Sequence, residues 1–91
     1  MPPQNPEQAR WFAAELAPHE STLRAYLRGQ FPSLPDVDDV VQESLVRVLR
    51  AHEKGRVESA RALLFATARN LALDQVRRQR VVAFEPMTEN A

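Results

Sequence analysis

The sequence predicts an all-α protein that folds as a compact four-helix bundle. Apolar residues recur at helical spacing through most of the chain. Prolines and small polar residues stand where helices would begin or end, and no stretch alternates in the way typical of a half-buried strand. No internal repeat is present either. We therefore expect the helices to pack around one core.

The first two helices are separated by a proline. The first is expected over about residues 6–17, because Asn5 is a suitable N-cap and Pro6 suits the first helical position. Pro18 disfavours helical geometry at the residue before it and should end or kink this helix. The second helix is expected over about residues 19–30. Its apolar face consists of Leu23, Tyr26 and Leu27.

The remaining helices follow a proline-containing connector. Asp36 is a good N-cap for a third helix over about residues 37–53. A polar loop over residues 53–59 should then lead to a fourth helix over about residues 60–80, with Ser59 as its cap.

A tail follows the fourth helix. Residues 81–91 contain Pro86, show no helical period and are interpreted as the start of a linker. The predicted folded domain therefore covers residues 1–80.

The third helix has an apolar face and a polar face. The core side is predicted to hold Val37, Val40, Val41, Ser44, Leu45 and Val48. The opposite side is predicted to hold Asp39, Gln42, Glu43, Val46 and Arg50, with Leu49 at its flank. Two apolar residues within a polar face suit a surface on which another helix docks. They are equally compatible with isolated apolar residues on a solvated face.

The fourth helix is apolar on its core side and rich in arginine elsewhere. Its core stripe is predicted to be Leu64, Ala68, Leu71 and Ala72, extended by Phe65 and Val76. Residues 61–80 carry five arginines and one acid, although the net charge of the whole chain is zero. The helix dipole alone would favour arginines at this end, but three of them within residues 77–80 favour contact with phosphate. Asp74 should pair with Arg77 or Arg78 along the helix.

Composition argues against several function classes. The chain has 91 residues, no cysteine, two histidines and two glycines. Neither a phosphate-binding glycine loop nor a catalytic Ser/His/Asp set can be recognised, so we predict no enzymatic activity, no catalytic residue, no metal and no cofactor. The longest apolar runs are far shorter than the ~20 residues that span a bilayer. The first residues lack a secretory signal, and we expect a cytoplasmic protein.

Two motifs together resemble a known family. The first is Asp-Asp-Val-Val-Gln-Glu at residues 38–43, and the second is the arginine-rich segment at residues 61–78. In this order and spacing they look like the conserved second region of bacterial sigma factors, most closely the extracytoplasmic-function (ECF) group. The resemblance extends over about residues 8–80. It also includes Phe12, His19, Leu23 and Tyr26 at the family's usual offsets.

The resemblance implies two macromolecular partners. The helix with the acidic motif is similar to the one that docks on the β′ clamp helices of the RNA polymerase core. Carried over residue by residue, the polymerase-binding set is Asp39, Gln42, Glu43, Val46 and Leu49. An anti-sigma factor is a further expected partner, and no membrane is expected to be involved.

The second partner that the resemblance implies is the −10 promoter element, mainly its non-template single strand. The loop would shape a pocket for an extruded base. Asn70 and Arg77 would lie near bases or the adjoining duplex. Phosphate would be contacted by Arg69, Arg78 and Arg80. The complete predicted DNA-binding set is Lys54, Arg56, Arg69, Asn70, Arg77, Arg78 and Arg80.

The chain departs from the family pattern in two ways. The family commonly has an aromatic residue where this chain has Leu63, so a stacking role is not carried over to that position. An ECF factor also has a second, helix-turn-helix domain that reads the −35 element. We therefore expect this chain to be a fragment with an authentic N-terminus, although an unusual single-domain protein is the alternative.

Two other functions remain open at this point. The first is a sigma-like interaction domain that binds polymerase or a regulator without reading DNA. The second is a general helix-turn-helix DNA-binding domain. The latter requires a short turn between two helices, whereas the third and fourth predicted helices are separated by a longer polar loop.

Overall fold

The computed structural model describes the backbone of residues 5–90 and the side chains of residues 5–80. Every regular element in this range is helical, which confirms the all-α prediction. The elements are α1 (Pro6–Glu15), the 3₁₀ helix η1 (Ala17–His19), α2 (Glu20–Gln30), α3 (Val37–Glu53) and α4 (Ala60–Asn90). None of the helices in the described range is long and apolar enough to cross a membrane.

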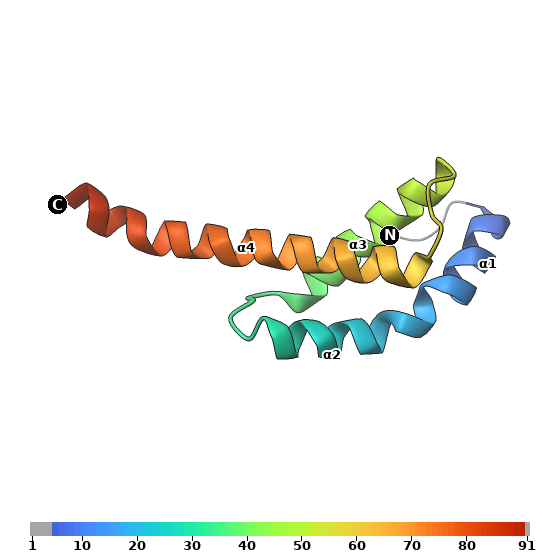
Figure 1. The fold of residues 1–91 in the computed structure, drawn as a ribbon, viewed down its shortest axis with the longest axis horizontal. Helices are drawn as coiled ribbons and strands as arrows, with labels where there is room; N and C mark the ends of the chain where they lie inside the picture. The colour runs from blue at the N-terminus through green and yellow to red at the C-terminus, as the bar shows by residue number, and fades with distance from the viewer. Residues whose placement is uncertain (1–4, 91) are drawn as a thin grey trace.

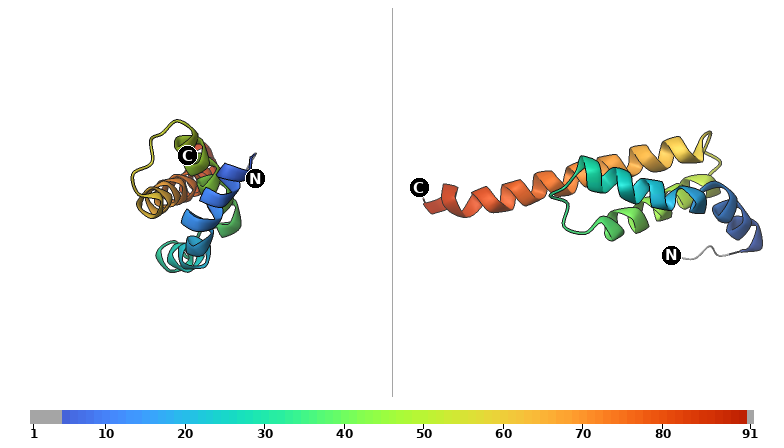
Figure 2. Two further views of the ribbon diagram at one scale, coloured as in Figure 1. Left: turned by 90° about the vertical axis from the view of Figure 1, so that its right-hand side faces the viewer. Right: turned by 90° about the horizontal axis from the view of Figure 1, so that it is seen from below.

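The arrangement of the helices differs from the compact four-helix bundle that we expected. The helices α2, α3 and α4 pack on one another, and the contact between α3 and α4 is the most extensive. Figures 1 and 2 show α1 at one end of this three-helix bundle, while α4 projects well beyond the other end. The molecule is therefore elongated, with extents of 56 × 25 × 21 Å.

The end of the fourth helix also differs from the prediction. We expected it to stop near residue 80, whereas α4 continues to Asn90. Pro86 was interpreted as a breaker, but a proline removes only one intrahelical donor, and helical bonding can resume around it at some cost. No glycine follows Gly55 to supply a C-terminal stop. The division into a domain and a linker near residue 80 stays a prediction.

The predicted caps are confirmed. The Asn5 side chain accepts a hydrogen bond from the backbone N–H of Gln8 at 2.7 Å. The Asp36 side chain accepts one from the N–H of Asp39 at 3.0 Å. The Ser59 hydroxyl accepts one from the N–H of Ala62 at 3.2 Å. Each of these bonds satisfies an N–H at the start of a helix that has no partner within the helix.

The core follows the faces predicted from helical spacing. Its fully buried members include Leu23 and Leu27 of α2, Val40, Val41 and Val48 of α3, and Leu64, Ala68 and Ala72 of α4. Ser44 is also buried, and its hydroxyl donates to the carbonyl oxygen of Val40 at 2.7 Å. A hydrogen bond within α3 thus satisfies the buried hydroxyl group of Ser44.

Candidate functional site

The predicted docking face lies on the outside of α3, with one correction. Asp39, Gln42 and Glu43 are exposed and Val46 is half-buried, as expected. Leu49 was placed at the edge of this face, but only 3% of its surface is exposed and it belongs to the core.

The burial of Leu49 has a physical reason. Leu49 lies one turn before His52 on the same side of α3, and the His52 ring contacts Trp11 of α1. The helical wheel treated α3 as buried on a single arc. In the structure Leu49 follows the buried Leu45 by four residues, so the buried arc is wider there than we assumed.

The acidic start of α3 is joined to both neighbouring helices. Arg24 of α2 bridges Glu20, at 2.9 Å, and Asp38. These hydrogen bonds, first the one to Asp38 and then the one to Glu20, raise the pKa of the Arg24 guanidinium. The side chain of Gln75 in α4 donates to Asp39 at 3.3 Å. Part of this acidic cluster therefore contacts both neighbouring helices.

The middle of the docking face is less constrained. Glu43 pairs with Arg47 one turn later at 3.0 Å, and both side chains are about half exposed. Exposed pairs of this kind contribute little to stability and can exchange partners. Gln42 and Val46 lie beside this pair, so the centre of the face combines an amide, an ion pair and an apolar side chain.

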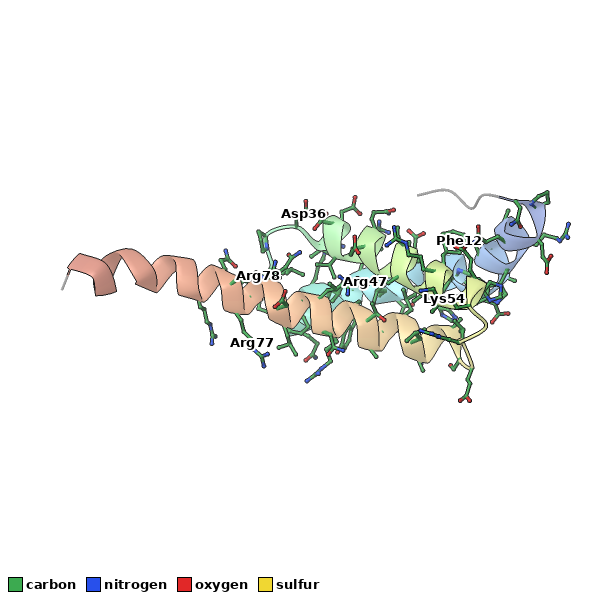
Figure 3. All side chains as sticks on the ribbon, turned by 90° about the horizontal axis from the view of Figure 1, so that it is seen from above. Phe12, Asp36, Arg47, Lys54, Arg77 and Arg78 are labelled. Atoms are coloured by element: carbon green, nitrogen blue, oxygen red, sulfur yellow. The ribbon has the colours of Figure 1, made fainter. Side chains whose placement is uncertain are left out.

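The arginines of α4 project in different directions. Figure 3 shows Arg78 on the side of α4 toward the start of α3 and Arg77 on the opposite side. Arg78 forms an ion pair with Asp74 at 2.7 Å, which confirms the pairing predicted for Asp74 and selects Arg78 over Arg77. Within the described residues, Arg69, Arg77 and Arg80 are exposed and form no ion pair.

A hollow of about 500 Å³ lies at the loop between α3 and α4. Gly55 and Arg56 at the start of the loop line it, and Leu63 of α4 forms part of its wall. The remaining lining residues are Glu58, Ser59 and Ala62. Lys54, also predicted to bind DNA, is exposed beside the hollow but does not line it.

The loop begins in a defined turn. The N–H of Gly55 donates to the carbonyl of His52 at 2.9 Å, and the N–H of Arg56 donates to that of Ala51 at 3.0 Å. This pair of bonds is a Schellman motif, which requires a residue in the left-handed region after the helix. Gly55 fills that position with φ 67°. The backbone of the loop is therefore fixed where the hollow begins.

A second hollow, not anticipated from the sequence, lies between α3 and α4. It measures about 390 Å³. Its lining residues are Arg47, Thr67, Asn70, Leu71 and Asp74. The four lining residues from α4 are spaced so that they share one face of the helix, and this spacing was present in the sequence. Asn70, which we predicted to lie near bases, therefore faces toward α3.

The comparison with known families matches the chain to Sigma-70 region 2 over residues 16–81, well over half of its length. The chain belongs to this family. Membership gives it a role in transcription initiation, with the RNA polymerase core and promoter DNA as partners. The family is one of transcription factors and not of enzymes. No curated protein and no solved structure gives a significant match.

The matched range contains every residue that we predicted to bind polymerase or DNA, whereas α1 lies outside it. In the described part of the chain, no three His, Cys, Asp or Glu side chains come together in a way that could hold a metal ion. The candidate site is therefore two protein surfaces, one on α3 and one on α4 with its preceding loop.

Proposed function

We propose that this domain docks on the β′ clamp helices of RNA polymerase through α3 and recognises and opens the −10 promoter element through α4 and the loop. In the same proposal the chain is of the ECF type and an anti-sigma factor covers one of these surfaces. The observation that carries the proposal is the family match, because residues 16–81 include both the acidic start of α3 and the arginines of α4.

The docking surface in this proposal is Asp39, Gln42, Glu43 and Val46. Its centre has the character of a helix-binding surface, with an apolar side chain surrounded by groups that can form hydrogen bonds. Leu49 supports this surface from below and does not contact the partner, because its side chain lies in the core.

The base-binding site in this proposal is the hollow at the loop. Its volume falls within the range usual for small-ligand pockets, roughly 300–1,000 Å³. Leu63 offers an apolar wall and Arg56 a cation beside it. Extruding a base costs a few kcal/mol, so a pocket for the base and contacts to the backbone must act together. Arg69, Arg77 and Arg80 are the exposed cations that can supply the backbone contacts.

Fluorescence anisotropy with matched oligonucleotides tests the DNA part of the proposal. We expect the domain to bind a single strand with the non-template −10 sequence more tightly than a scrambled strand or the duplex. One small domain supplies too little binding energy to open a duplex by itself. Equal or tighter binding to the duplex, with no preference among single strands, would contradict −10 recognition. That result would favour a domain that binds polymerase or a regulator without reading DNA.

A further inference from the structure

The helix α1 contacts the end of α3 through two side chains. The Trp11 ring stacks on the His52 ring, with centroids 3.8 Å apart and planes 9° from parallel. One turn earlier in α1, the Gln8 amide donates to the Glu53 carboxylate at 3.3 Å, and Gln8 is only 7% exposed. The last turn of α3 therefore receives an aromatic contact and a partly buried polar contact from α1.

The same turn of α3 holds the start of the loop. The carbonyl of His52 accepts the N–H of Gly55, and the carbonyl of Ala51 accepts that of Arg56. His52 is thus joined to α1 through its ring and to the loop through its backbone. Figures 1 and 2 show α1 and the loop at the same end of the bundle. The turn residues Gly55 and Arg56 themselves line the hollow.

We propose that Gln8 and Trp11, called the α1 brace below, hold the loop in the shape that accepts an extruded base. They are positioning residues, because they act through His52 and Glu53 and neither lines the hollow. The inference rests on the proposed −10 recognition by the loop. It assigns a role to α1, which lies outside the residues matched to the family.

The physical argument concerns loop order. Residues 54, 55, 56, 58 and 59 are exposed, and Val57 is the loop residue that packs against the core, so few packing contacts hold the loop itself. Its order depends on the turn at Gly55 and Arg56, and this turn depends on the position of two carbonyl groups in the last turn of α3. Helix ends fray readily when nothing packs on them. By packing on this end, α1 keeps the acceptors in place and lowers the ordering cost of binding a base.

Amide exchange in the absence of DNA tests the brace directly. The variants Trp11→Ala and His52→Ala each remove the stack, and His52→Phe keeps an aromatic ring in its place. Arg10→Ala is the matched control, because Arg10 is an exposed residue of the same helix. We expect the Gly55 and Arg56 amides to exchange about two- to tenfold faster in both alanine variants, relative to core amides of α3, and to recover in His52→Phe.

A general loss of stability would give a different pattern. It would speed exchange at the core and loop amides by the same factor. Unchanged relative exchange at Gly55 and Arg56 in both alanine variants would overturn the brace, as would an equal effect of Arg10→Ala.

Binding experiments then connect the brace to base recognition. In Trp11→Ala the preference for the −10 single strand over a scrambled strand should fall about two- to tenfold, while affinity for the scrambled strand changes less than twofold. Coupling between two sites is reciprocal, so the −10 strand should in turn protect Trp11. Trp11 is the only tryptophan, and its fluorescence should become less accessible to acrylamide with the −10 strand but not with the scrambled strand.

The outcomes separate this inference from the proposed function. If the parent protein prefers the −10 strand and both alanine variants keep that preference in full, the inference fails and −10 recognition stands. If the parent shows no preference, −10 recognition fails, and the exchange measurement alone decides whether α1 braces the loop.

Discussion

The charged surfaces of α3 and α4 differ in how far their charges take part in the fold. On α3, Asp38 is bonded to Arg24 of α2 and Asp39 to Gln75 of α4. On α4, Arg77 and Arg80 are exposed and form no ion pair with the described residues. Charges of the first kind take part in the packing as well as in the proposed binding surface. Charges of the second kind contribute nothing to the described packing, so their removal should change binding and leave stability nearly constant.

The largest expected effect is on stability, and it distinguishes Leu49 from Val46. Leu49→Ala should lower the free energy of unfolding by about 2–5 kcal/mol, because it opens a cavity in the core. Val46→Ala should cost clearly less, because Val46 is only partly buried. Thermal or denaturant unfolding of the two variants checks this. Equal losses would mean that Val46 is as much a core residue as Leu49.

Binding to the polymerase clamp should show the next largest effect. The double variant Gln42→Ala with Val46→Asp should lose about 1–3 kcal/mol or more of binding free energy, because it removes a central amide and places a charge on the apolar spot. Titration with a β′ clamp-helix fragment measures this. Arg28→Ala, an exposed substitution on α2, is the control. If the double variant folds normally and binds as well as the parent, the docking face has been misassigned.

Gly55→Ala should destabilise the turn at the start of the loop by about 1–2 kcal/mol. The cost comes from the left-handed backbone conformation, which disfavours any residue with a Cβ. No atom lies within 4 Å of the position that the Cβ would take, so a steric clash does not contribute. Thermal unfolding measures this effect. Gly29→Ala is the control variant, since Gly29 has no positive φ. Two equal, small effects would argue against the turn as described.

Single arginine substitutions should have smaller effects, and these should depend on salt. Arg77→Ala should weaken every oligonucleotide alike and reduce the slope of log K against log salt by about 0.7, the value for one phosphate on a single strand. Arg78→Ala should change the slope less, because Asp74 already pairs with Arg78. Anisotropy titrations at several salt concentrations distinguish the two. A larger effect from Arg78 would place the strand on the side of α4 that faces α3.

The smallest expected effect concerns Asp74. Asp74→Asn removes an exposed pair within the helix and should cost about 0.5 kcal/mol or less. Sequence preference for the −10 strand should stay the same. Because Asp74 also lines the hollow with Asn70, a changed preference in this variant would give the hollow between α3 and α4 a reading role.

Local features of this fold could be predicted from the sequence, and the packing between distant elements could not. The caps at Asn5, Asp36 and Ser59 follow from the chemistry of side chains next to a helix start. The buried faces of α3 and α4 follow from helical spacing. Both kinds of inference need only nearby residues.

The errors concern the end of α4 and features that depend on more than one element. Leu49 is buried in the core, although the helical wheel placed it at the flank of the polar face, because the buried arc of α3 is wider than we assumed. The Trp11–His52 stack joins residues 41 positions apart, so neither residue alone suggested it. In the candidate site, the position of the loop hollow was predicted from the resemblance. The hollow lined by Arg47 and Asn70 was missed because it requires the register between two helices.

The most direct test of the account measures two variants in two assays. The α3 variant carries Gln42→Ala and Val46→Asp. The α4 variant carries Arg77→Ala together with a shortened loop between α3 and α4. Each is titrated with the β′ clamp-helix fragment and with the −10 single strand. We predict that the α3 variant loses clamp binding and keeps the −10 preference, and that the α4 variant loses the −10 preference and keeps clamp binding. If either variant, while folded, loses both activities or neither, α3 and α4 do not form separate surfaces for polymerase and promoter DNA.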